Sequence, residues 1–216
     1  MNRKFWNMKE PVNTWTHFVV FIAGIFALLL MVIKAWGDPR LVFTVTIFGL
    51  SIITLYGASS LYHWVETTPE RELVLRKIDH ISIYFLIAGT YTPVLSQCLA
   101  GSWKWTMLAV IWTLSIIGAI LKIWFMKIPR YISTTLYVGL GWMALVPIRK
   151  LTEALPTAGM ALLVAGGIAY TVGGVIYATK IFNFVPGKFG FHEVFHIFVG
   201  LGTLLHFLLI YLYVIP

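Results

Sequence analysis

Charged residues are scarce in this chain. Asp, Glu, Lys and Arg make up 11% of its 216 residues, whereas about a quarter is usual in a soluble domain. Hydrophobic residues make up 59%, and apolar stretches of the ~20 residues that a spanning helix needs recur along the whole length. This composition excludes an ordinary soluble protein, leaves no room for a separate soluble domain, and indicates one integral membrane domain over residues 1–216.

Three other features of the composition narrow the range of possible functions. Cys98 is the only cysteine, so an intramolecular disulfide is excluded and thiol catalysis has no support. The last apolar stretch has no lysine that could form a Schiff base with retinal. The formal charge of +8 could indicate nucleic-acid binding, but the Lys and Arg residues lie almost entirely between apolar stretches, where membrane topology explains them. No nucleic-acid partner is expected.

Charged or Pro- and Gly-marked breaks divide the chain into seven apolar spans. We therefore expect an all-α, seven-transmembrane helix bundle with spans at residues 15–33, 41–63, 78–98, 104–125, 131–148, 157–179 and 192–214. The N-terminal apolar run is too long for a signal peptide and is predicted to be a retained first span.

Basic residues predict the orientation of the bundle. The N-terminal tail and the second, fourth and sixth loops hold eleven Lys and Arg, and the other side holds five. Because basic loops stay in the cytoplasm, the N-terminus is predicted to be cytoplasmic and the C-terminus outside. The eleven are Arg3, Lys4, Lys9, Arg71, Arg76, Lys77, Lys122, Lys127, Arg130, Lys180 and Lys188, and the five are Lys34, Arg40, Lys104, Arg149 and Lys150.

Polar residues in the spans collect at one predicted membrane depth, near the cytoplasmic face. A charged side chain near the bilayer centre costs at least ~2.5 kcal/mol on insertion scales, so such residues are informative. Four spans contribute to this level: His17 in the first, Ser59 and His63 in the second, Asp79 and His80 in the third, and His192, Glu193 and His196 in the seventh.

Helical spacing sharpens this cluster. His192 and His196 are four residues apart, so they share a helix face and can bind one ion. Zinc takes neutral imidazole nitrogens, and a catalytic site keeps three protein ligands with water in the fourth place. His63, His192 and His196 would supply those three, and Asp79 could accept a hydrogen bond from the water or from a ligand ring. His206 has no polar companion at helical spacing and is predicted to be structural.

The string FHEVFHIF at residues 191–198 matches the H-E-x-x-H pattern of zinc proteases. The extended pattern fails, because Val199 and Gly202 stand where Gly and His would be needed. No acidic residue follows Glu193 to serve as a downstream ligand. The third ligand must come from upstream, and Glu193 is better interpreted as a helix-start residue, stabilised by the helix dipole, than as a general base.

These motifs resemble a known family, the haemolysin III branch of the progestin and adipoQ receptor superfamily, which includes the adiponectin receptors. The resemblance rests on Ser59-x-x-x-His63, Asp79, His192-x-x-x-His196, Glu10-x-x-Asn13-x-x-x-His17 and the segment IDHISIYFLIAGTYTP at residues 78–93. It implies a seven-helix bundle with a zinc ion near the cytoplasmic face. By resemblance the ligands are His63, His192 and His196, and Asp79 and Ser59 attend the water that completes the site.

The resemblance implies more than one function. Related receptors are linked to ceramidase-like hydrolysis of lipid amides, bacterial members to membrane homeostasis, and the branch name to cytolysis. Our leading hypothesis is a zinc-dependent hydrolase of a lipid amide or ester in the plasma membrane. The alternatives are a non-enzymatic lipid sensor with structural zinc, a pore-forming cytolysin and, more weakly, a transporter. A membrane lipid is the expected ligand, and no protein hormone is expected, because the chain has almost no soluble N-terminal region.

Overall fold

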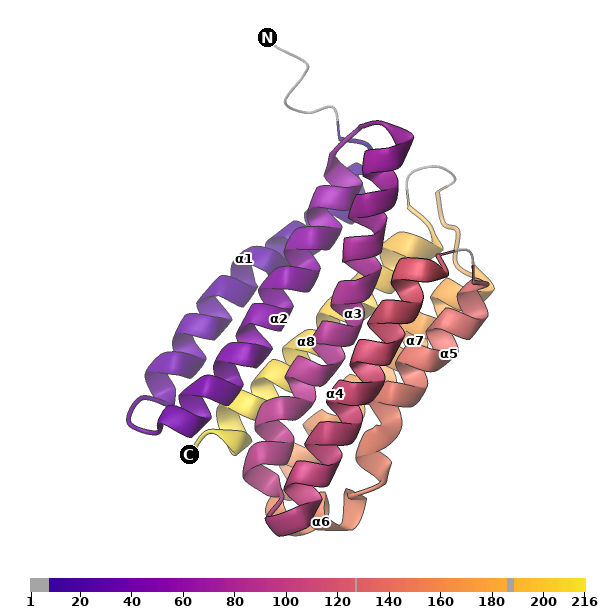
Figure 1. Ribbon diagram of the computed structural model, residues 1–216. Helices are drawn as coiled ribbons and strands as arrows, with labels where there is room; N and C mark the ends of the chain where they lie inside the picture. The colour runs from indigo at the N-terminus through magenta and orange to yellow at the C-terminus, as the bar shows by residue number, and fades with distance from the viewer. Residues whose placement is uncertain (1–7, 127, 186–188) are drawn as a thin grey trace.

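The computed structural model describes residues 8–126, 128–185 and 189–216, and this part of the chain forms a bundle of helices (Figure 1). Arg3, Lys4, Lys127 and Lys188, which contributed to the predicted orientation, lie outside the described residues. The helices are α1 (Pro11–Lys34), α2 (Pro39–Trp64), α3 (Pro69–Cys98), α4 (Gly101–Trp124), α5 (Arg130–Gly141), α6 (Ile148–Ala154), α7 (Thr157–Thr179) and α8 (Phe191–Leu209). A short 3-10 turn, Trp142–Leu145, follows α5, and a π turn, Ile210–Val214, follows α8.

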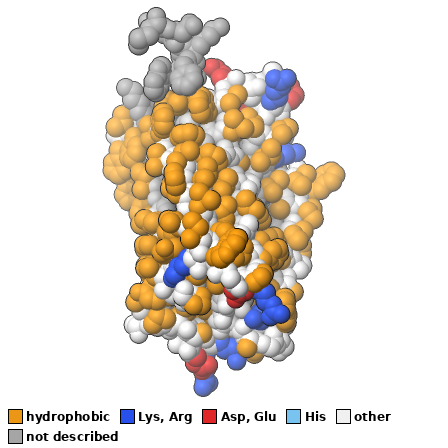
Figure 2. Space-filling model, turned by 90° about the vertical axis from the view of Figure 1, so that its left-hand side faces the viewer, with side chains coloured by type: hydrophobic (Ala, Val, Ile, Leu, Met, Phe, Trp, Pro, Cys, Tyr) orange, Lys and Arg blue, Asp and Glu red, His pale blue; other side chains and the backbone are white. Residues whose placement is uncertain are grey.

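The bundle has the surface of a membrane protein. Five helices, α1, α2, α4, α7 and α8 with its π turn, are long and apolar enough to cross a bilayer, and a bent pair around α5 and α6 would make six. Hydrophobic side chains cover most of the face seen in Figure 2, while charged side chains lie toward its ends. An apolar belt between charged ends is the surface that a bilayer favours, because water is absent from the hydrocarbon core.

The third helix begins earlier than its predicted span. We expected residues 66–77 to be a charged loop, but α3 starts at Pro69 and is 30 residues long. Proline is favoured in the first turn of a helix, and Glu70 and Glu72 there interact favourably with the helix dipole. The charged segment is therefore an extension of the third helix, which lies between α2 and α4 and packs against both.

The fifth predicted span, residues 131–148, is a broken helix. α5 ends at Gly141, a 3-10 turn follows, and α6 leaves at 57° to the preceding segment. Pro147 precedes α6 and has no N–H to continue the helical hydrogen bonds. The Tyr91 hydroxyl of α3 donates to the Gly141 carbonyl and accepts from the Ala144 N–H, so it satisfies backbone groups at the break.

One end of the bundle gathers the residues of interest. α1, α3, α5 and α8 begin there, and α2 and α4 end there; we call it the histidine end. Two backbone hydrogen bonds fix the start of α1 against the end of α2, from Lys9 N to Trp64 O at 3.2 Å and from Glu10 N to His63 O at 3.0 Å. These bonds hold Glu10 beside His63, although 53 residues separate the two in sequence.

Candidate metal centre

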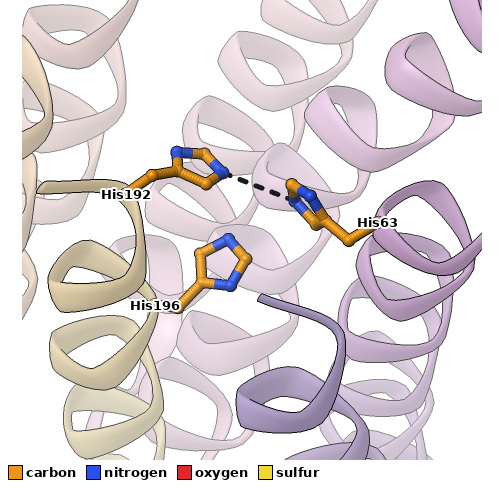
Figure 3. A group of neighbouring side chains, drawn as sticks. All are labelled: His63, His192 and His196. Carbon is orange, nitrogen blue, oxygen red and sulfur yellow. Dashed lines mark hydrogen bonds between the residues drawn. The ribbon is translucent and has the colours of Figure 1, made fainter. Parts of the chain in front are cut away.

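Three histidines from two helices meet at the histidine end (Figure 3). His63 lies in the last turn of α2, and His192 and His196 lie in the first turns of α8. The side chains of His63 and His196 are buried, and that of His192 is half-buried. The i, i+4 spacing places the two α8 rings on one face, as the sequence predicts, and helix packing brings His63 to that face.

The spacing of the imidazole nitrogens suits one metal ion. One ring nitrogen from each histidine lies within 4.8 Å of those of the other two. The Nε2 atoms of His63 and His192 are 3.4 Å apart. Two nitrogens bound to the same tetrahedral zinc at 2.0–2.1 Å would be about 3.3 Å apart. A hydrogen bond between two imidazoles would explain the approach of one pair of rings. The approach of a third ring is typical of ligands that converge on an ion.

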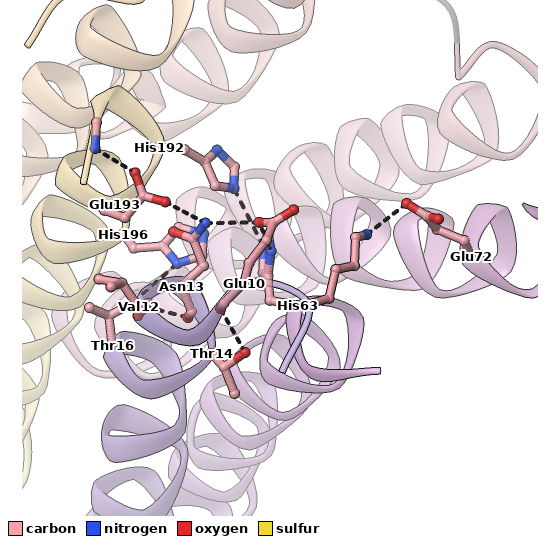
Figure 4. A network of polar contacts seen from close by, with 12 residues as sticks. Glu10, Val12, Asn13, Thr14, Thr16, His63, Glu72, His192, Glu193 and His196 are labelled. Atoms are coloured by element: carbon pink, nitrogen blue, oxygen red, sulfur yellow. Dashed lines mark hydrogen bonds and ion pairs between the residues drawn. The ribbon is translucent and has the colours of Figure 1, made fainter. Parts of the chain in front are cut away.

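Glu10 orients the upstream histidine. The His63 Nδ1–H donates to Glu10 Oε2 at 2.6 Å, which leaves His63 Nε2 free to bind a metal (Figure 4). A metal-binding histidine commonly donates its other ring N–H to a carboxylate in this way. The hydrogen bond from His63 lowers the pKa of Glu10 to about 2, although partial burial acts in the opposite direction. The Glu10 carboxylate is therefore charged at neutral pH.

Asn13 and Glu193 connect α1 to the start of α8. The Asn13 side-chain amide donates to Glu10 Oε2 at 2.8 Å and to Glu193 Oε1 at 2.7 Å. The other Glu193 oxygen accepts from the Gly190 N–H at 2.7 Å. Both oxygens of Glu193 thus accept hydrogen bonds, one from Asn13 of α1 and one from the residue before α8. On the same side, Thr16 Oγ1 lies 3.4 Å from His196 Nδ1.

Asp79 and Ser59 share a cavity with two of the three histidines. Asp79 is near the start of the apolar part of α3, and its carboxylate interacts with the hydroxyl of Ser59 in α2. Both residues line a cavity of about 190 Å³, together with His192 and His196. The cavity continues through the bundle to His206 and is lined mainly by apolar side chains. A carboxylate and a hydroxyl therefore share this cavity with two of the three imidazoles.

The remaining histidines lie outside the three-nitrogen group. His17 stacks on His196 with ring centroids 3.6 Å apart, and both His17 nitrogens are buried without a hydrogen-bond partner among the described residues. His80 lines the cavity beside Asp79, and its buried Nδ1 also has no partner in the described part of the chain. His206 Nε2 donates to the Leu163 carbonyl at 3.2 Å, which fits the structural role expected from the sequence.

Sequence reasoning missed several residues of this region. It treated Arg76, Lys122 and Arg130 as topology signals, but all three line the cavity near the histidines. Tyr177 of α7 also lines the cavity, with its ring centroid 5.5 Å from that of His192. The position of Lys122 inside a predicted apolar span was the one sequence signal that could have identified a member of this group.

Comparison with known proteins places the chain in a family. The model of the family described as "Haemolysin-III related" matches residues 5–207. The chain is 39% identical to "Hemolysin-3" of Bacillus cereus over 212 residues, which cover 96% of this chain and 93% of the relative. It is 36% identical to "Hemolysin-3 homolog" of Bacillus subtilis (strain 168), with 95% and 94% covered. It is 24% identical to "Monocyte to macrophage differentiation factor" of Homo sapiens, with 95% and 84% covered.

These matches cover nearly the whole chain, and the bacterial relatives share more than a third of its residues. The family model spans the positions of His63, His192 and His196. The resemblance inferred from the sequence motifs is confirmed. The chain belongs to the haemolysin-III-related family of integral membrane proteins.

Proposed function

We propose that this protein is a zinc-binding membrane hydrolase that cleaves an amide or ester bond of a membrane lipid. The observation that carries the proposal is the convergence of three imidazole nitrogens within 4.8 Å of one another beside a largely apolar cavity. Three protein ligands with one open side are the arrangement of catalytic zinc, whereas structural zinc is enclosed by four. His192 and His196 line the cavity that also holds Asp79 and Ser59, so a substrate in the cavity would reach an ion held by the histidines.

The donor set fits zinc. Neutral imidazole nitrogens are preferred zinc ligands, and a carboxylate that orients one of them is a common supporting group. His63, His192 and His196 would hold the ion, and Glu10 would keep the His63 ring in the correct tautomer. Bound zinc supplies Lewis acidity, which activates water and polarises a carbonyl group.

The residues of the chain have separate roles in this proposal. The apolar wall of the cavity takes the acyl chain and excludes bulk water from the reacting bond. Asp79 accepts the proton that the attacking water loses and returns it to the leaving amine or alcohol. Ser59, which interacts with Asp79, would position its carboxylate for this proton transfer. The charge that develops on the former carbonyl oxygen lies at the histidine side of the cavity.

Metal content tests the centre. Protein purified in detergent is expected to contain about one zinc per chain, and His63→Ala, His192→Ala and His196→Ala are each expected to lose it. His206→Ala is the matched control, because His206 is a buried histidine of the same cavity that lies outside the three-nitrogen group. Zinc retained in all three ligand variants would remove the proposed centre.

Turnover tests the activity. Wild-type protein is expected to release fatty acid from a lipid amide or ester, and Asp79→Asn is expected to abolish release while zinc remains bound. Full zinc content with no turnover of any lipid would instead support a lipid sensor with structural zinc. The name "Hemolysin-3" of the Bacillus cereus relative suggests a third outcome, cytolysis, for which dye leakage from liposomes at stoichiometric protein is the assay.

We also propose seven spans in the plasma membrane, with the histidine end in the cytoplasm. α3 would be the third span, because it packs between two apolar helices, and the bent α5–α6 pair would be the fifth. The excess of basic residues on the N-terminal side supports this orientation. Fusion of a reporter that is active only outside the cytoplasm tests it: the reporter is expected to be active after Pro216 and inactive after Glu66.

A further inference from the structure

Three basic side chains line the cavity beside the candidate metal centre. Arg76 comes from α3, Lys122 from the last turn of α4, and Arg130 is the first residue of α5. Arg76 and Arg130 are exposed, whereas Lys122 has only 4% of its surface accessible. Two cations therefore lie at the mouth of the cavity and one lies below them. Arg76 is within electrostatic range of Lys122.

None of these cations forms an ion pair with a carboxylate in the described part of the chain, although Asp79 is within electrostatic range of Arg76. All eight Asp and Glu of the chain lie in its described part, and no carboxylate there approaches Arg76, Lys122 or Arg130 within 4.0 Å. The Lys122 ammonium donates to the Ser133 hydroxyl at 2.7 Å, a neutral acceptor. Arg130 lies over the rings of Tyr177 and Phe191, at 5.2 and 5.3 Å from their centroids, which positions its charge without neutralising it.

A buried ammonium group without a counter-charge is costly, so a residue such as Lys122 usually has an anion nearby. Asp79 is the acidic residue that lines this cavity, and its carboxylate also interacts with the Ser59 hydroxyl. Three positive charges face that one negative charge. The surplus is about two charges, enough to balance the single charge of a phosphodiester or the charge of about two on a phosphomonoester at neutral pH.

We propose that the three cations bind the phosphate of an anionic membrane lipid, whose acyl chain enters the apolar part of the same cavity. Arginine guanidinium groups at the mouth present paired N–H donors that match phosphate oxygens. Lys122 supplies a third charge from below, and Ser133 positions it. This proposal deepens the proposed function and rests on it for the fate of the lipid, but binding is measurable without turnover.

Lipid binding to the purified full-length protein tests the proposal. The probes are fluorescent phosphatidylglycerol and phosphatidylcholine with the same acyl chains, and the readout is fluorescence anisotropy in a neutral detergent. We expect phosphatidylglycerol to bind at least about tenfold more tightly, because the choline group of phosphatidylcholine is repelled by the cations. Arg76→Gln and Lys122→Met are each expected to weaken phosphatidylglycerol binding about tenfold, and Lys122→Arg is expected to retain it.

Arg71→Gln is the matched control, because Arg71 is exposed on the same helix as Arg76 and does not line the cavity. The proposal is overturned if Arg76→Gln binds like wild type, if Arg71→Gln loses as much affinity, or if phosphatidylcholine binds equally well. Inorganic phosphate that binds as tightly as the lipid would assign the site to free phosphate instead. Melting temperatures show whether Lys122→Met is folded. If it is not, lipid binding by Arg76→Gln decides whether the proposal holds.

Different results would refute the proposed metal centre and the proposed phosphate site. His63→Ala is expected to lose zinc and to keep its affinity for phosphatidylglycerol. If His63→Ala loses lipid binding while Arg76→Gln keeps it, the metal centre binds the head group and the cation site is wrong. If zinc is absent from the wild type but phosphatidylglycerol binding depends on Arg76, the phosphate site stands and the hydrolase proposal fails.

Discussion

Glu10 provides a test of the metal centre that leaves all three candidate ligands in place. Its Oε2 atom accepts from His63 Nδ1 at 2.6 Å and from the Asn13 amide at 2.8 Å. Glu10→Gln keeps the size of the side chain and one oxygen acceptor but removes the negative charge that strengthens the His63 bond. Loss of such a supporting carboxylate typically weakens metal binding about 10- to 100-fold, or about 1.4 to 2.7 kcal/mol.

Because the glutamine oxygen still accepts one hydrogen bond, Glu10→Gln is expected near the tenfold end of that range and Glu10→Ala near the hundredfold end. Competition between the purified protein and a fluorescent zinc chelator at neutral pH measures the affinity. Glu72→Gln is the control, because this substitution removes the same charge from the same end of the bundle. Glu72 accepts a hydrogen bond from Lys9 at 2.6 Å and makes no hydrogen bond with the three histidines. Unchanged affinity in Glu10→Gln, or an equal loss in Glu72→Gln, would refute the role assigned to Glu10.

Three further predictions concern stability. Gly89→Ala places a methyl group 2.7 Å from Ser51 Cβ and is expected to destabilise the fold by about 1–3 kcal/mol. In thermal melts, adding Ser51→Gly to this variant should restore part of the loss. Gly139→Ala is the control and should melt like wild type, because its methyl group meets nothing within 4 Å. Lys34→Met removes two hydrogen bonds to carbonyls of the C-terminal segment and should speed carboxypeptidase digestion; an unchanged rate would contradict it. The pKa of Glu10 is lowered from 4.5 to about 2, so the stability that its ionised carboxylate contributes is present above about pH 4.5 and is lost as the pH falls toward 2. In metal-free protein, Glu10→Gln should therefore reduce the fall of the melting temperature between about pH 4.5 and about pH 2.

Local pattern predicted the helices of this protein well, but it did less well at their ends. Apolar runs identified the segments that form α1 to α5, α7 and α8, and five of the helices, or six spans with the bent pair, are long and apolar enough to cross a bilayer. The start of α3 was missed because hydropathy falls across residues 66–77, although Pro69 and the acidic residues after it favour a helix in water. The break after Gly141 depends on Pro147 and on a hydrogen bond from Tyr91, which is 50 residues away in sequence. Such a distant contact is not visible in helical periodicity.

The candidate site shows the same division between local and distant information. The spacing of His192 and His196 placed both rings on one helix face, because both belong to α8. The approach of His63 could be expected from membrane depth and family resemblance. The contact between Glu10 and His63 could not, because it depends on backbone pairing between the start of α1 and the end of α2. Lys122, Arg76 and Arg130 were counted for topology, and only helix packing shows that they line one cavity.

The two proposed sites together narrow the choice of substrate. Two of the three histidines, His192 and His196, line the same cavity as the three cations, so a lipid held by its phosphate would present to the metal a bond close to that phosphate. The acyl esters of a glycerophospholipid meet this requirement, because they are attached to the same glycerol as the phosphate. A neutral lipid amide has no phosphate and would leave Lys122 buried without an anion, at the cost of an unpaired charge. Anionic glycerophospholipids are therefore the substrates to test before neutral amides, and faster turnover of a neutral amide, unaffected by Arg76→Gln, would show that the cations serve another purpose.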